Sequence, residues 1–78
     1  MEISSVDQAL ELLENYNGRP ENFKLKIPLS GKLTFESKLV NPDIAMAIIT
    51  DKVLEKGWIP NGSEDRDGFR YYQYSETS

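Results

Sequence analysis

Hydrophobic residues in the first part of the chain recur at the spacing of a helix. Between Val6 and Tyr16 they return every three or four residues, and acidic residues occupy the other side. Ser5 stands before this segment as a typical helix cap, and Gly18 follows it as a residue that readily ends a helix. The pattern predicts a first amphipathic helix.

The next segment changes to an alternation of apolar and polar residues, which is typical of half-buried strands. The alternation runs over residues 23–29 and again over residues 33–39, and Ser30-Gly31 between them predicts a two-residue hairpin turn. Pro28 cannot donate a hydrogen bond to a neighbouring strand, so we expect the first strand to lie at a sheet edge or to end there.

A second helix has the strongest local start signal in the chain, with Asn41 as cap and Pro42 at the first helical position. It is expected to end at Gly57. Its first half, residues 44–49, is apolar all round rather than along one stripe. We therefore expect this helix to be buried on more than one side.

The last part of the chain predicts a second hairpin, in which a strand from Trp58-Ile59 and an aromatic-rich strand over residues 69–74 flank a polar loop over residues 61–68. The order of elements is therefore α-β-β-α-β-β in one small α+β domain over residues 1–78. The most economical arrangement is a four-stranded antiparallel sheet with two helices packed on one face. The expected core consists of Leu10, Leu13, Leu25, Ile27, Phe35, Ile48, Ile49 and Val53.

Composition narrows the chemistry that this fold can perform. The 78 residues leave room for one modest core, and the chain contains no Cys and no His. Disulfides, thiolate zinc sites, catalytic triads and histidine metal sites are excluded. We expect no enzyme activity, no cofactor and no metal. The start of the sequence does not resemble a leader peptide and no apolar run reaches about 18 residues, so we expect a cytoplasmic protein that does not enter a membrane.

Charge is unevenly distributed along a chain whose net charge is -4. Residues 1–18 carry four acids and no base, whereas residues 19–40 carry five bases and two acids. If the apolar side of the first hairpin packs on the helices, its lysines line the open face of the sheet, where one set of residues from the last strand joins them. This predicted binding surface consists of Lys24, Lys26, Lys32, Lys38, Arg70, Tyr72 and Tyr74. It suits an acidic partner or a phosphate backbone, unless the lysines only keep the strands soluble.

The start of the second helix predicts an interface. One layer of packing leaves part of Ile44, Met46 and Ala47 facing water, which is an unusual use of consecutive apolar residues. We expect either a homodimer or a docked partner at these residues, the alternative being that the C-terminal segment or a hairpin of the same chain folds over them.

Residues 51–59, followed by residues 66–72, resemble the recognition helix and wing of winged-helix DNA-binding domains. The resemblance covers less than half of the chain and implies DNA binding through the helix and hairpin. That family places a helix-turn-helix before the wing, whereas residues 23–40 here predict a hairpin, so we interpret the similarity as a helix–hairpin pattern without assigning membership. The leading functional interpretation is a non-catalytic module that binds another protein or a second copy of itself. The alternative is a nucleic-acid-binding domain that uses the basic sheet face or the winged-helix-like hairpin.

Overall fold

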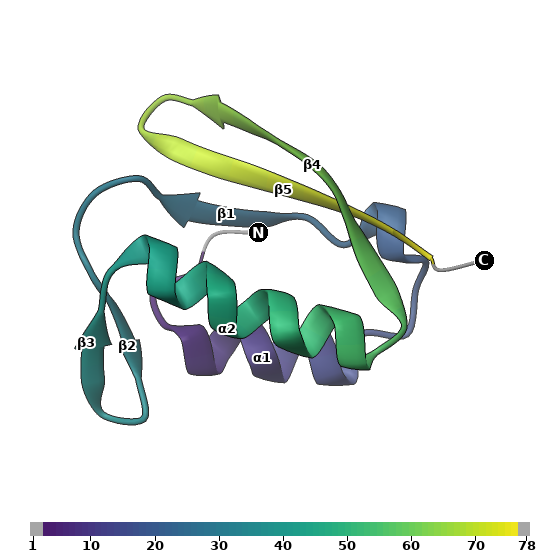
Figure 1. Cartoon of the computed structure of the whole chain (residues 1–78), viewed down its shortest axis with the longest axis horizontal. Coiled ribbons are helices and arrows are strands. Elements are labelled where there is room, and N and C mark those ends of the chain that lie inside the picture. The colour runs from purple at the N-terminus through teal and green to yellow at the C-terminus, as the bar shows by residue number, and fades with distance from the viewer. Residues whose placement is uncertain (1–2, 77–78) are drawn as a thin grey trace.

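The computed structural model describes residues 3–76 and confirms the α+β class (Figure 1). Within these residues, two helices, one short 3-10 helix and five strands follow one another. They are α1 (Val6–Asn15), η1 (Pro20–Asn22), β1 (Leu25–Pro28), β2 (Leu33–Phe35), β3 (Lys38–Val40), α2 (Pro42–Glu55), β4 (Trp58–Arg66) and β5 (Phe69–Glu76).

Both helices start where local side chains satisfy their first backbone N–H groups. Ser5 Oγ accepts a hydrogen bond from the backbone N of Gln8 at 3.0 Å, and Asn41 Oδ1 accepts one from the backbone N of Ile44 at 2.9 Å. Pro42 follows Asn41 at the first helical position, where its missing N–H costs nothing. The predicted starts of both helices are confirmed.

The prediction of one four-stranded sheet is wrong. The strands form a three-stranded antiparallel sheet in the order β1-β5-β4 and a separate two-stranded hairpin of β2 and β3. The hairpin turn lies at Glu36 and Ser37, whose φ angles of 49° and 66° match the left-handed pair of a type I′ turn. The chain therefore reverses within the stretch that alternation predicted as one strand, and β1 pairs with β5 instead of β2.

The predicted polar loop over residues 61–68 is also shorter than expected. Strand β4 continues through most of it, with a register shift between Pro60 and Ser63, and the reversal to β5 uses only Asp67 and Gly68, which both have positive φ. Residues 23–40 contain no α-helix. The likeness to winged-helix domains therefore extends to a helix followed by a hairpin and includes no helix-turn-helix in residues 23–56.

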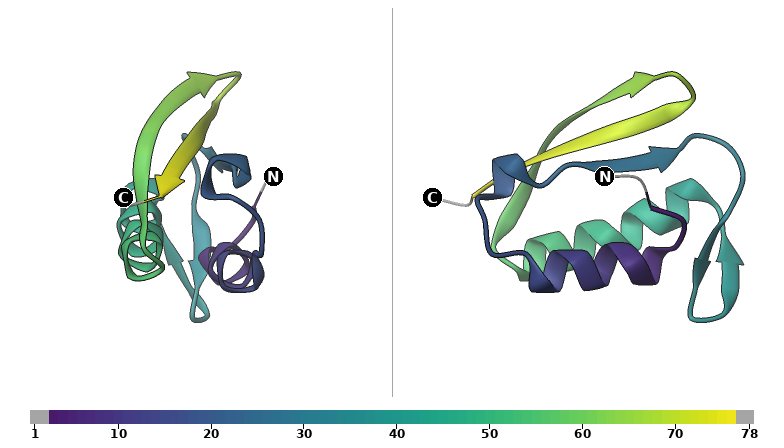
Figure 2. Two further views of the ribbon diagram at one scale, coloured as in Figure 1. Left: turned by 90° about the vertical axis from the view of Figure 1, so that its right-hand side faces the viewer. Right: turned by 180° about the vertical axis from the view of Figure 1, so that it is seen from behind.

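The molecule has two layers, with α1 and α2 side by side under one face of the three-stranded sheet (Figures 1 and 2). The β2–β3 hairpin stands at the end where both helices begin, and Asp7 Oδ2 of α1 accepts a hydrogen bond from the backbone N of Glu36 at 3.0 Å. One core joins both layers. Its buried hydrophobic residues are Ile3, Val6, Ala9, Leu13, Phe23, Leu25, Ile27, Leu33, Ala45, Ile49, Val53, Trp58 and Tyr74.

The predicted core is confirmed for most of its residues. Five of the eight are buried, namely Leu13, Leu25, Ile27, Ile49 and Val53. The other three, Leu10, Phe35 and Ile48, are half-buried and pack against the core from its border. The core also has an aromatic end that was not predicted, where Phe23, Trp58 and Tyr74 contact one another with ring centroids 5.5–6.4 Å apart.

Candidate functional site

The outer face of the three-stranded sheet is the surface that the fold leaves uncovered. Both helices lie on the opposite face, and in Figure 2 no other element among residues 3–76 lies over the outer one. Strand register assigns residues to the two faces, because directly opposed residues of an antiparallel pair share a side. Lys26 opposes Tyr71 and Pro28 opposes Phe69, whereas the buried Leu25 opposes Tyr72. Phe69, Tyr71 and Lys26 therefore lie on the outer face.

Cations and aromatic rings alternate along this face. Lys26 Nζ lies 4.2 Å from the ring centroid of Phe69 and 5.8 Å from that of Tyr71, and the guanidinium carbon of Arg66 lies 4.5 Å from the centroid of Tyr71. These distances are typical of cation–π contacts. A hydrogen bond with Tyr71, followed by the charge of Glu64, raises the pKa of Arg66 above its ordinary value. We call Lys26, Arg66, Phe69 and Tyr71 the cation–aromatic row.

The predicted placement of Arg70, Tyr72 and Tyr74 on the open face is wrong. Tyr74 is only 1% exposed and belongs to the core, and Tyr72 packs against it. Arg70 lies on the same side of β5 and donates two hydrogen bonds to the carboxylate of Asp65, at 2.6 and 3.2 Å. Phe69 and Tyr71, on the opposite side of β5, face outward in place of the predicted Tyr72 and Tyr74.

The four lysines do not share one face. Lys26 lies on the outer face, and Lys24, two residues before it, is exposed with the same parity. Lys32 directly precedes β2 and Lys38 lies in β3, so both belong to the separate hairpin. The lysines divide because β1 and β2 do not pair. A binding role for any of them stays a prediction.

The predicted interface on α2 is exposed only in part. The helix turns Ala45, Ile49 and Val53 into the core at four-residue intervals. Ile44 is 49% exposed and Ala47 is also exposed, whereas Met46 is half-buried against the core. Ile44 and Ala47 are therefore available to a partner, and Met46 also supports the fold.

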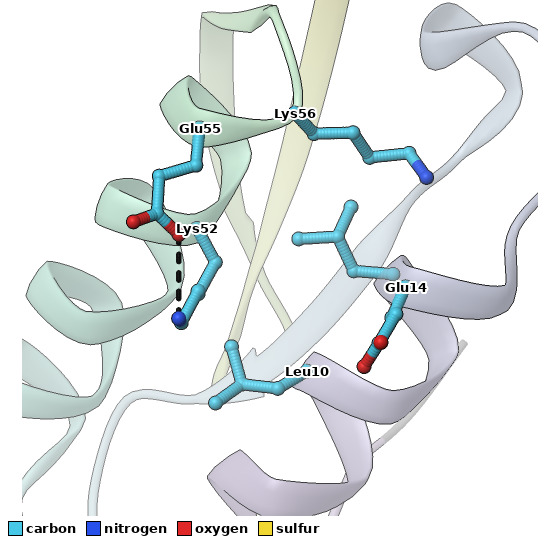
Figure 3. A pocket seen from close by; sticks show the side chains of 6 residues that line it. Leu10, Glu14, Lys52, Glu55 and Lys56 are labelled. Carbon is cyan, nitrogen blue, oxygen red and sulfur yellow. Dashed lines mark ion pairs between the residues drawn. The ribbon is translucent and has the colours of Figure 1, made fainter.

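A groove of about 460 Å³ separates the solvent-facing sides of α1 and α2 (Figure 3). Its lining residues are Leu10, Leu13, Glu14, Lys52, Glu55 and Lys56. The two leucines come from α1 and lie between the charged side chains of both helices. Lys52 Nζ pairs with Glu55 Oε2 at 3.3 Å, and Lys56 Nζ donates a hydrogen bond to the backbone O of Tyr16 at 3.3 Å. The groove is thus apolar between the helices and charged along its rim.

No protein-family model, curated protein or solved structure matches this chain.

Asp65 and Tyr74 are two titratable residues whose pKa values are shifted by their surroundings. Within residues 3–76 no three Asp or Glu side chains gather closely enough to hold a metal ion. The hydrogen bonds from Arg70 lower the pKa of Asp65, so this carboxylate is charged at neutral pH and is a poor general acid. Burial raises the pKa of Tyr74, whose hydroxyl lies inside the core and has no hydrogen-bond partner within residues 3–76. No helix in the described part of the chain is long and apolar enough to cross a membrane.

Proposed function

We propose that this chain is a non-catalytic module that binds another protein through the outer face of its three-stranded sheet. The observation that carries the proposal is the cation–aromatic row on the one sheet face that the helices leave uncovered. Tyr, Phe and Arg are the residue types most enriched at protein interfaces, where a few of them supply most of the binding energy.

The geometry of the row favours binding because its side chains are already held in place. Phe69 and Tyr71 are half-buried between their neighbours, and each ring has a cation packed on it. Binding to these rings costs less conformational entropy than binding to mobile side chains, which would first have to be immobilised. The two rings therefore provide contact area at a low cost in conformational entropy.

The charge of this face favours an acidic partner. Lys24, Lys26 and Arg66 contribute three positive charges, and Glu64, opposite Tyr71, contributes one negative charge. Complementary charge speeds association mainly over a Debye length of about 8 Å at physiological salt. We expect salt to slow the association of the natural partner.

A non-catalytic, cytoplasmic role is the remaining part of this proposal. The chain contains neither His nor Cys, and the pKa of Asp65 is shifted away from the range that general acid catalysis requires. A cytoplasmic setting agrees with a small domain that uses no disulfide to stabilise its core.

A charge-reversal experiment with a matched control tests the proposal. The double variant Lys26→Glu/Arg66→Glu changes the row, and Lys32→Glu/Lys38→Glu makes the same charge change on the β2–β3 hairpin. Each variant and the wild type would be used to capture the partner from extract of the native cell, and the affinity for the purified partner would then be measured. We expect the first variant to lose the partner and the second to retain it. Equal affinity of both variants for the partner would refute the proposed surface.

A second candidate function is single-stranded nucleic-acid binding, which the spacing of Phe69 and Tyr71 favours. Two rings on alternate residues of a central strand, beside basic side chains, form a platform on which bases can stack. The acidic residues near the β4–β5 turn, Glu64, Asp65 and Asp67, repel phosphate, and the net charge of -4 acts in the same direction. Titration with single- and double-stranded oligonucleotides at two salt concentrations decides the matter. Tight binding that weakens steeply with salt would favour nucleic acid over protein.

A further inference from the structure

The groove between α1 and α2 continues into a longer apolar strip along α2. Ile48 and Ile44 precede the groove residue Lys52 at four-residue intervals, so the three side chains lie on one ridge of the helix. Ile48 is half-buried and Ile44 is 49% exposed. Leu10 from α1 lines the groove across from Lys52 (Figure 3), so the two isoleucines extend the apolar surface of the groove along α2.

Acidic side chains dominate the surroundings of this strip. Helix α1 carries Asp7, Glu11 and Glu14 and no base, and α2 adds Asp51 beside Ile48. Asp43, Glu55 and two lysines, Lys52 and the C-cap Lys56, complete the charges of the helix layer, which has six acids against two bases and a net charge of -4. Lys52 is paired with Glu55, and Lys56 is held by the backbone O of Tyr16 and the ring of Trp58.

The acidity of the strip determines what can occupy it. A second copy of this chain would bring a helix layer of the same net charge, -4, against this one, and like-charged surfaces repel each other. A basic partner is instead attracted by the same acidic side chains. An apolar strip between two adjacent helices also has the shape that receives the side-chain ridge of a third helix.

We propose that the groove between α1 and α2 binds a basic amphipathic helix of a partner protein. The helix inserts apolar residues spaced three and four positions apart between Leu10 and Ile48, and its lysines or arginines meet Glu11, Glu14 and Asp51. This site lies on the opposite side of the molecule from the cation–aromatic row and prefers the opposite charge. The two surfaces are thus independent, and binding at one does not require the other.

Designed peptides supply the probe. A fluorescent peptide of roughly 16 residues carries leucines on one helical face and lysines elsewhere, and binding is followed by fluorescence anisotropy. One control peptide has glutamate in place of lysine, and another has the same composition with the leucines scattered around the helix. We expect the chain to bind the first peptide at least about tenfold more tightly than either control.

Matched variants locate the site. Glu11→Lys/Glu14→Lys reverses two charges on α1, of which Glu14 lines the groove, and Glu64→Lys/Glu76→Lys reverses two exposed charges on the sheet. The first variant is expected to lose at least about tenfold in affinity and the second to change little. Ile44→Ser removes apolar surface at a half-exposed position, so it should weaken binding without unfolding the chain. The proposed occupant would be wrong if the peptide with scattered leucines bound equally well, or if the two charge variants had equal effects. It would also be wrong if the wild type were a dimer that Ile44→Ser dissociates.

Discussion

Replacing Tyr74 by Phe should stabilise the protein. The Tyr74 side chain is 1% exposed, and its hydroxyl has no hydrogen-bond partner among the described residues. Its ring contacts Phe23 and Trp58 at centroid distances of 6.0 and 6.4 Å. The substitution keeps the ring and removes only the hydroxyl, so the aromatic contacts remain.

The magnitude follows from the cost of burying an unpaired hydroxyl, which is about 1–3 kcal/mol. Part of this gain is lost because removal of one oxygen loosens the local packing, so we expect the free energy of unfolding to rise by about 1 kcal/mol. In a domain of this size such a gain raises Tm by about 4–8 °C. Urea and thermal unfolding, followed by circular dichroism, measure both quantities. A loss of about 1 kcal/mol or more on substitution would mean that the hydroxyl is paired, and would refute this description of the core.

The same residue predicts how stability depends on high pH. Burial raises the pKa of Tyr74 in the folded state above the value of about 10 expected in the unfolded chain. Between these two pKa values the folded state binds one more proton than the unfolded state, so the free energy of unfolding decreases as the pH rises above about 10. Tyr74→Phe lacks this group. Its stability advantage over the wild type should therefore widen between pH 8 and pH 11, and an advantage that stays constant would contradict the raised pKa.

Three further predictions test the fold. Ile49→Ala should cost about 2–5 kcal/mol, because Ile49 is fully buried, and an unchanged Tm would place it outside the core. Replacing Glu36-Ser37 by Asn-Gly should stabilise the chain by up to about 1 kcal/mol in urea unfolding, since both positions have positive φ; a loss of stability would contradict the type I′ turn. Ile44→Lys should change stability by no more than about 0.5 kcal/mol. Sedimentation should find wild type and Ile44→Lys equally monomeric, whereas a wild-type dimer would restore the homodimer interpretation.

The elements that could be predicted from the sequence are those set by neighbouring residues. Ser5 and Asn41 cap helices through contacts three residues along the chain, so the signal and the structure it produces lie close together. Core positions such as Ile49 and Val53 follow from helical spacing for the same reason. These signals need no knowledge of which distant segments meet.

Strand pairing required information that the local pattern does not contain. Leu33 and Phe35 of β2 point inward. Because the chain turns at Glu36-Ser37, Val40 opposes Leu33 and points to the same side. Without this turn, continued alternation would point Leu39 inward instead. Leu39 is in fact 68% exposed. Glu-Ser is not a typical type I′ sequence, so nothing in these residues marks the reversal.

The candidate surface was missed for a related reason. Strand β5 has aromatic residues at both parities, Phe69 and Tyr71 on one side and Tyr72 and Tyr74 on the other. Hydrophobicity alone cannot say which pair enters the core. The pairing of Leu25 with Tyr72 decides it, and that register joins segments more than forty residues apart. Lys26 was correctly placed on the outer face because Leu25 and Ile27, on either side of it in β1, are both apolar and identify the other side of the strand as the buried one.

Amide hydrogen exchange of the chain with and without its captured partner tests the central proposal most directly. Binding through the outer face should protect residues 24–28 and 64–73, with Lys26 and Tyr71 at the centre, because these strands carry the cation–aromatic row. Residues 33–40 of the separate hairpin provide an internal control and should exchange as before. Protection confined to α1, α2 or the hairpin, with β1 and β5 unchanged, would contradict the assignment of the outer sheet face as the protein-binding surface.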